Sequence, residues 1–196
     1  MKIGILTHYD VNNQGAQLQM YALYKRLEEL GHMPKVLTFK KSYDFNTDDN
    51  LKNQVSIKSV PYFFKNYLIR KGFGLTLHNV QKYKSNQKYR LATFKHENYA
   101  TADIDAAIVG SDEVFSIECG VNIMMYGHAV NTDNMISYAP SFGQTNIDII
   151  EEYHCRNIIS SGLSRFKAIS VRDENTAEVV EQLTGIKPTI VCDPVL

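Results

Sequence analysis

Short apolar runs rich in β-branched residues alternate with segments of helical periodicity along most of this chain. After the first run, Met20, Leu23, Leu27 and Leu30 recur every three or four positions, which predicts an amphipathic helix that ends near Gly31. Strands that alternate with helices assemble into parallel sheets covered by helices. The sequence therefore predicts a Rossmann-like, doubly wound and mainly parallel α/β sheet. The predicted strands are residues 2–6, 35–39, 104–109, 135–139, 167–171 and 188–192.

Four further helices are predicted between these strands. The last of them has an N-cap signal, Asp173, at its start and a glycine, Gly185, at its end. A chain of 196 residues is long enough to bury one hydrophobic core, so we expect one domain over residues 1–196. The four helices are residues 57–71, 79–97, 148–162 and 174–183.

Composition excludes several classes of protein. With 44% hydrophobic and 21% charged residues and a formal net charge of zero, the chain has no general polyanion-binding signature. It contains neither a signal-peptide pattern nor the ~18–20 consecutive apolar residues of a membrane span. The three cysteines form no C-x-x-C pair and the six histidines have no ligand spacing, so we predict no disulfide framework and no metal site. A cytoplasmic protein fits these features best.

The zero net charge conceals a basic block. Residues 51–99 carry ten Lys or Arg against one acid, Glu97, a local charge of +9, with aromatic residues interleaved. Such a block can form a surface that meets anionic lipid headgroups. More often it belongs to ordinary amphipathic helices whose solvated faces are basic. A nucleic-acid interface is the weakest interpretation, because no recognised binding module is present.

Four polar segments follow predicted strands, at the edge where open α/β sheets bind ligands. The first contains Asn12, Asn13, Gln14 and Gly15 and precedes the first helix. It matches neither G-x-G-x-x-G nor the phosphate loop G-x-x-x-x-G-K-[ST]. Its amides and the N–H groups of a helix N-terminus suit an anion or a hydroxylated ligand. A long capped loop without a ligand is the alternative.

The second segment contains Gly110, Ser111, Asp112 and Glu113. Asp112 and Glu113 are candidate catalytic residues, because carboxylates at a strand end can accept hydrogen bonds from sugar hydroxyls or remove a proton. The alternative is that Ser111 or Asp112 caps a following helix.

The remaining two segments contribute candidate binding residues. One is a turn with Ser141, Phe142 and Gly143, which could approach a ligand closely. The other begins with Arg172, a candidate for a bidentate contact with a carboxylate or phosphate. An ion pair between Arg172 and an adjacent acid or a neighbouring loop is the alternative.

These segments, taken in order, resemble the motifs of the polysaccharide pyruvyl transferase family. Residues 12–23 resemble N-Y-G-A-x-L-Q-A-Y-A-L, residues 105–115 resemble D-x-x-I-x-G-S-D-Q-V-W, and residues 136–143 are similar to Y-A-x-S-F-G. Residues 170–176 resemble S-V-R-D-x-x-S, and residues 193–194 match the start of D-P-T. Five motifs in register make the resemblance specific.

Two motifs depart from the family pattern. The family's Gln-Val-Trp becomes Glu113-Val114-Phe115, which adds a negative charge and removes an indole that could stack on a sugar. The family's Asn-Tyr-Gly becomes Asn13-Gln14-Gly15.

The resemblance implies a two-domain enzyme, similar in outline to GT-B-like glycosyltransferases, with its site in the cleft between two Rossmann-like domains. Residues 1–196 would be the N-terminal half, with a variable basic helical insert at about 45–98 and the second domain absent from this chain. The implied reaction transfers pyruvate from phosphoenolpyruvate to a sugar of a cell-surface or capsular polysaccharide as a ketal, without a cofactor. We expect this half alone to be inactive.

The resemblance also implies roles. This half would hold the acceptor, a lipid-linked glycan at the inner face of a bacterial membrane, while phosphoenolpyruvate would bind mainly to the other half. Asp112 and Glu113 would bind or deprotonate acceptor hydroxyls, residues 12–15 would orient the sugar, and Arg172 would shape the cleft. The basic block, residues 51–99, would dock on the membrane. Two alternatives stay open: one half of a GT-B-like glycosyltransferase, and a non-catalytic carbohydrate-binding module.

Overall fold

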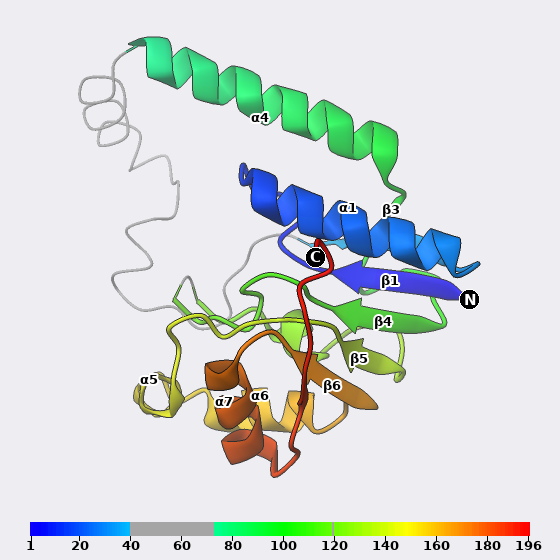
Figure 1. Cartoon of the computed structure of the whole chain (residues 1–196). Helices are drawn as coiled ribbons and strands as arrows, with labels where there is room; N and C mark the ends of the chain where they lie inside the picture. Colours follow the sequence, from blue (N-terminus) through cyan, green and yellow to red (C-terminus); the bar gives the residue numbers. More distant parts are fainter. Residues whose placement is uncertain (40–72, 119) are drawn as a thin grey trace.

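The computed structural model describes residues 1–39, 73–118 and 120–196. They form a seven-stranded sheet in the order β3-β2-β1-β4-β5-β6-β7, in which every pair of neighbours is parallel (Figure 1). This confirms the predicted Rossmann-like, doubly wound α/β fold. The strands are β1 (Lys2–Leu6), β2 (Met33–Thr38), β3 (His96–Asn98), β4 (Ala106–Val109), β5 (Met135–Ser137), β6 (Ala168–Val171) and β7 (Thr189–Ile190).

The sheet reverses its winding direction between β1 and β4. From β1 the chain moves outward through β2 to β3, then returns to β4 on the other side of β1 and continues through β5 and β6 to β7. Strands β1 and β4 pair directly, with Ile3 opposite Ala106 and Leu6 opposite Val109. The loops that leave their carboxyl ends therefore start side by side, at the position where doubly wound sheets bind ligands.

Helix α1 (Gln14–Glu29) covers one face of the sheet. Its buried Met20, Leu23 and Leu27 form one hydrophobic cluster with Ile5 and Val36 of the strands. Burial of a side chain of this size stabilises the fold by roughly 1.5–3 kcal/mol. The spacing of three and four residues seen in the sequence thus corresponds to the face that α1 packs on the sheet.

The opposite face carries the larger core. Phe115, Tyr126 and Phe142 lie at its centre, each at most 1% exposed. The ring centroids of Phe115 and Tyr126 are 5.5 Å apart, and those of Phe115 and Phe142 are 5.3 Å apart. The elements on this face are the 3₁₀ helix η3 (Ile123–Tyr126) and the helices α5 (Ile147–Glu152), α6 (Arg156–Leu163) and α7 (Glu174–Thr184).

The predicted ends of α7 are confirmed. The carboxylate of Asp173 accepts a hydrogen bond of 2.8 Å from the backbone N–H of Thr176, as an N-cap does. Gly185 has a φ of 72°, the left-handed conformation that favours glycine after a helix.

Two helix predictions are corrected. The helix expected at residues 148–162 is two helices, α5 and α6, because the chain turns at His154, whose φ is 53°. The helix expected at residues 79–97 is part of α4 (Phe73–Thr93) and gives way to the edge strand β3. Phe94 is buried beside the ring of Tyr24, and the N–H of Val36 donates to the carbonyl of Lys95, so the chain here joins the sheet. The helix expected at residues 57–71 lies outside the described residues.

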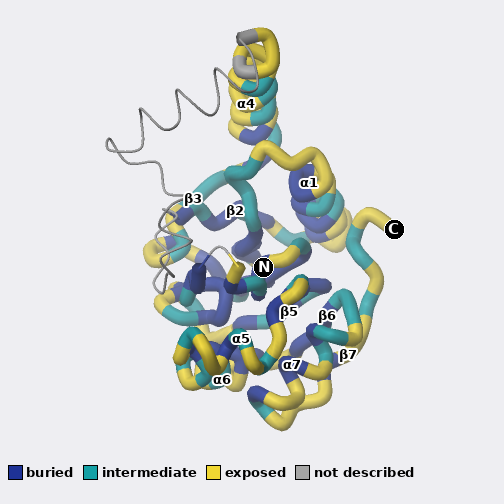
Figure 2. The backbone as a smooth tube through the Cα atoms, turned by 90° about the vertical axis from the view of Figure 1, so that its left-hand side faces the viewer, coloured by how far each residue is buried: buried dark blue, intermediate teal, exposed yellow. Residues whose placement is uncertain are grey.

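Helix α4 stands apart from the sheet. Figures 1 and 2 show it outside α1, with mostly exposed residues along its length. Its attachment lies toward its C-terminal end, where Arg90, only 4% exposed, donates to the carboxylate of Asp10 at 2.6 Å. The side chain of Asn86 donates to that of Asn12 at 2.8 Å. None of the helices in the described part of the chain combines the length and hydropathy needed to cross a membrane.

Candidate functional site

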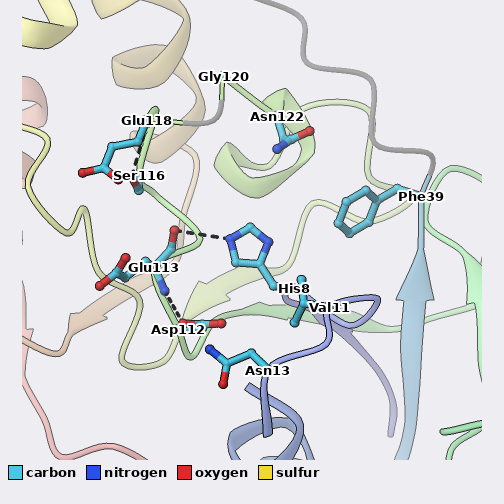
Figure 3. Close-up of a pocket in the computed structure, with 10 residues that line it drawn as sticks. All are labelled: His8, Val11, Asn13, Phe39, Asp112, Glu113, Ser116, Glu118, Gly120 and Asn122. Atoms are coloured by element: carbon cyan, nitrogen blue, oxygen red, sulfur yellow. Dashed lines mark hydrogen bonds between the residues drawn. The ribbon is translucent and has the colours of Figure 1, made fainter. Parts of the chain in front are cut away.

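A pocket of about 300 Å³ opens where the winding direction of the sheet reverses. Its walls come from the loops after β1 and β4, the residue directly after β2, and the stretch before η3 (Figure 3). This is the position expected for a ligand in a doubly wound sheet. The pocket is lined by His8, Val11, Asn13, Phe39, Asp112, Glu113, Ser116, Glu118, Gly120 and Asn122.

Two contacts join the loop after β1 to the loop after β4. The hydroxyl of Thr7 donates to the carbonyl of Ser111 at 3.0 Å, and this contact is buried. A ring nitrogen of His8, Nε2, lies 3.4 Å from the carbonyl oxygen of Glu113. Figure 3 shows the His8 ring above the carboxylate of Asp112. The two loops thus present an imidazole and a carboxylate to one space.

Asn13 has two roles in the structure. It is the N-cap of α1, because its side-chain oxygen accepts the N–H of Gly15 at 2.9 Å, and it also lines the pocket. The loop before it is held by Gln17, whose amide donates to the carbonyls of Tyr9 at 3.1 Å and Val11 at 3.3 Å. The capped-loop alternative and the ligand-site interpretation are therefore compatible.

Asp112 does not cap a helix, so the structural alternative for this position is wrong. Its φ of 87° is left-handed, and its carboxylate accepts the N–H of the next residue, Glu113, at 2.9 Å. The preceding Gly110 has a φ of 117°, and an added Cβ there would lie 2.3 Å from the carbonyl oxygen of Tyr138. Only glycine fits this approach between the β4 and β5 loops.

Arg172 lies between two carboxylates from distant parts of the chain. Its guanidinium nitrogens are 3.8 Å from a carboxylate oxygen of Glu113 and 3.7 Å from one of Asp193. The side chain of Gln19 on α1 also donates to Asp193. Of the alternatives for Arg172, the structure thus shows ion pairs between its guanidinium and carboxylates on neighbouring loops. The Arg172 side chain is 29% exposed and lies outside the pocket lining.

The turn after β5 packs next to Glu113 of the site. Ser141 is 2% exposed and Phe142 is fully buried. Gly143 approaches the Glu113 carboxylate so closely that a Cβ added to Gly143 would lie 3.3 Å from that carboxylate.

The pKa of the Asp173 carboxyl, next to this turn, is lowered. Partial burial of the carboxyl is the largest single effect and acts to raise the pKa, but hydrogen bonds from Ser141 and Thr176 lower it further than burial raises it.

The predicted site residues thus separate into two groups. Asn13, Asp112 and Glu113 line the pocket. Gln14 lies instead in a shallow hollow between α1 and α4, and Asn12 contacts α4. The other predicted site residues outside the pocket lining are Gly15, Gly110, Ser111, Ser141, Phe142, Gly143 and Arg172.

The departure at Phe115 takes on a different meaning in the structure. Its ring is fully buried against Tyr126 and Phe142, so it belongs to the core. In this chain the departure therefore alters the core, and Phe115 does not line the pocket.

Seven lining residues were not among the predicted site residues: His8, Val11, Phe39, Ser116, Glu118, Gly120 and Asn122. His8 follows a strand and could have been selected by that position. Phe39 directly follows β2, while Ser116 and Glu118 depend on an irregular loop that no periodicity reveals. Asn122 is 9% exposed, and its side-chain oxygen has no hydrogen-bond partner among the described residues. Such an unpaired buried oxygen is costly unless a ligand or water satisfies it.

The pocket is acidic. Asp112, Glu113 and Glu118 contribute three carboxylates, whereas no Lys or Arg of the described residues lines it. Within residues 1–39, 73–118 and 120–196, no group of three or more potential ligands is clustered as a metal ion would require. The arrangement can accept hydrogen bonds from hydroxyl groups and can take up a proton at Asp112 or His8.

Comparison with known proteins gives one family. The family model of polysaccharide pyruvyl transferase matches residues 13–196. A search of curated proteins and a search of solved structures returned no match. The matched range includes every loop that lines the pocket except the residues directly after β1. The chain therefore belongs to the polysaccharide pyruvyl transferase family.

Proposed function

We propose that this chain provides the acceptor-binding half of an enzyme that transfers pyruvate from phosphoenolpyruvate to a sugar of a cell-surface or capsular polysaccharide. One observation carries the proposal: a pocket rich in hydrogen-bond acceptors lies at the switch point of the sheet in a chain of this family. Such a pocket suits a hydroxyl-rich acceptor. An anionic donor suits it poorly, because three carboxylates line it.

The reaction joins one carbon of the donor to two sugar hydroxyls. Two new C–O bonds form at the enol carbon, the bond from that carbon to the phosphate oxygen breaks, and phosphate leaves. The two hydroxyls lose their protons: one goes to the methylene carbon, which becomes the methyl group, and the other leaves with the phosphate. A base near the hydroxyls and a cation near the phosphate would lower the barrier.

The described residues suit these needs in separate places. Asp112 faces the pocket and would accept a hydroxyl proton, and His8 lies above it in a position to hold or relay that proton (Figure 3). Arg172 lies outside the pocket, beyond Glu113, and would be the cation nearest the donor. In this arrangement Glu113 stands between acceptor and donor. It would orient Arg172 rather than act as a second base.

A single experiment tests the transfer. A protein in which residues 1–196 are joined to the family's second domain is incubated with phosphoenolpyruvate and a pool of cell-envelope glycolipids, while phosphate release and the mass of the glycan are followed. Acceptor-dependent release with a pyruvyl-sized mass gain is expected. Asp112→Asn should lower the rate by ~10²–10⁴, the usual contribution of a general base. Full activity of Asp112→Asn would refute the base role. A matched control is Asp148→Asn, in the first turn of α5 and outside the pocket.

Two other functions would give different outcomes in the same assay. A GT-B-like glycosyltransferase would release nucleotide from a panel of nucleotide sugars and ignore phosphoenolpyruvate. A carbohydrate-binding module would bind glycan without turnover of either donor.

We further propose that α4 makes a peripheral contact with the inner face of a bacterial membrane, where lipid-linked acceptors are presented. Leu77, Val80, Lys84, Lys88 and Leu91 are all exposed and recur at spacings of three or four residues, so they share one face of the helix. Residues 73–95 contain no acid. Apolar residues between lysines favour an anionic lipid surface.

Vesicle sedimentation tests this contact. The protein should pellet with vesicles that contain anionic lipid and not with neutral vesicles, and a double change of Lys84 and Lys88 to Gln should reduce pelleting. The matched control changes Lys25 and Lys167 to Gln, because these exposed lysines lie outside α4. Equal pelleting of the two double variants would refute the assignment to α4.

A further inference from the structure

The charges of the pocket walls restrict the kind of acceptor that can enter. The carboxylates of Asp112, Glu113 and Glu118 belong to the lining, and no Lys or Arg of the described residues does. Arg172 is outside the lining and already lies between the carboxylates of Glu113 and Asp193. A ligand with its own carboxylate, phosphate or sulfate would therefore meet the carboxylates of Asp112 and Glu118 with no cation in the lining to compensate them.

Hydrogen-bonding capacity gives an independent restriction. Asn122 is 9% exposed and lines the pocket, and its side-chain oxygen has no partner among the described residues. The carboxylate of Asp112 accepts one backbone N–H, from Glu113, which leaves most of its lone pairs available. Both groups need N–H or O–H donors from the ligand. Acid groups in their ionised form offer only acceptors.

The shape of the pocket is consistent with a sugar ring. Val11 and Phe39 supply an apolar part of the lining, and Phe39 is 7% exposed. The polar residues of the lining include Asn13 and Asp112, which lie next to each other in Figure 3. A pyranose has C–H groups that can contact the apolar part and hydroxyls that can reach the polar part.

We infer that this pocket selects acceptor sugars that carry no acid group, and that it binds an amino sugar more tightly than the matching neutral sugar. The inference rests on the proposed acceptor role of the pocket and adds its substrate class. An ammonium group supplies three N–H donors and a positive charge to walls that hold three carboxylates. A neutral hexose supplies hydroxyl donors alone.

Binding of three sugars with the same ring tests the inference. Glucose, 2-amino-2-deoxyglucose and glucuronic acid are titrated into the intact chain at pH 7, at low and high salt, and followed by NMR or calorimetry. The amino sugar should bind about tenfold more tightly than glucose, and glucuronic acid about tenfold more weakly. High salt should reduce both differences, because it screens partly exposed charges.

Variants of the lining residues test whether the pocket walls cause the selectivity. Asp112→Asn and Glu118→Gln should each reduce the preference for the amino sugar several-fold, whereas Glu181→Gln, on an exposed position of α7, should leave it unchanged. Asn122→Leu should weaken the binding of all three sugars and keep the order of their affinities. The thermal stability of this variant should not fall, because the side-chain oxygen has no partner to lose within the described part of the chain.

The outcomes separate the two proposals. Equal binding of glucose and glucuronic acid would overturn the selectivity while leaving a sugar site in place. Failure of all three sugars to bind would overturn the acceptor role of the pocket and the selectivity with it. Retained selectivity without pyruvyl transfer would support the inference and count against the proposed reaction.

Discussion

The two faces of the sheet differ in how they are built. On the face of α5, α6 and α7, the rings of Tyr126 and Phe142, each at most 1% exposed, pack around Phe115. On the face of α1, one helix packs on the strands, and α4 lies outside it with many exposed residues (Figure 2). The first face is a continuous core, whereas the second is layered and ends in a helix attached mainly near one end.

This difference between the faces suggests a division of roles: one face positions the pocket, and the other presents α4 to partners. The loop with Asp112 leads directly into the aromatic core through Phe115, so the pocket rests on the rigid face. Helix α4 can change without disturbing that core, because its attachment consists of a few polar contacts and ring contacts. Surfaces that meet variable partners are expected on such attachments, while catalytic groups need rigid support.

The largest effect is expected for Phe115→Ala, which removes the central ring of the rigid face. Loss of a fully buried phenyl ring costs roughly 3–5 kcal/mol in the free energy of unfolding. Urea denaturation followed by circular dichroism measures this. Leu91→Ala on α4 is the control, since Leu91 is 67% exposed and its loss should cost below about 0.5 kcal/mol. Similar costs for the two variants would remove the distinction between the faces.

Much of this architecture was predictable from the sequence. Every strand predicted from an apolar run is present, and central strands such as β4 show why, because strands buried on both faces need continuous apolar residues. The edge strand β7 was predicted from the same kind of run although its two residues are exposed. Strand β3 was missed because His96–Asn98 is short, polar and at the edge of the sheet, where a pattern of burial is weak. The break at His154 was missed because a left-handed non-glycine residue gives no local signal.

The site was predictable only in part. Asn13, Asp112 and Glu113 were found because strand ends of a doubly wound sheet converge. Asn122 was not found, because it reaches the pocket through an irregular loop whose path depends on tertiary packing. The neighbours of Arg172 were equally hidden, since Glu113 and Asp193 are brought to it by three separate loops.

A smaller effect is expected when α4 is loosened. Arg90→Met keeps the length of the side chain but removes the guanidinium that contacts Asp10 and the carbonyl of Val11. Because Arg90 is buried and Asp10 is 40% exposed, we expect a loss of about 1–3 kcal/mol in the free energy of unfolding.

Hydrogen exchange shows where this loss occurs. Amides of α4 should exchange faster in Arg90→Met, while those of β4 and β5 should change little. Arg26→Met on α1 is the control, because its ion pair with Glu29 is exposed on both sides. Faster exchange throughout the sheet would mean that α4 is part of the same cooperative unit as the core.

The smallest effect concerns the rigid face at low pH. The pKa of the Asp173 carboxyl is lowered in the folded chain, because its hydrogen bonds with Ser141 and Thr176 outweigh the opposing effect of burial. A carboxyl with a lowered folded pKa stabilises the fold fully above its unfolded pKa of about 3.9 and loses this contribution as pH falls through the folded value.

Asp173→Asn tests this contribution, because it keeps an N-cap residue but removes the charge. We expect the variant to be less stable than the wild type at pH 7 by about 0.5–1 kcal/mol, and the difference to begin to shrink below about pH 4 and to disappear below the folded pKa. Denaturant unfolding at pH 3, 5 and 7 measures the difference, with Asp133→Asn as an exposed control that shows none. A stability difference that stayed constant over this pH range would mean that Asp173 acts through its shape rather than its charge. The cap would then be an ordinary helix start with no electrostatic link to the turn beneath the pocket.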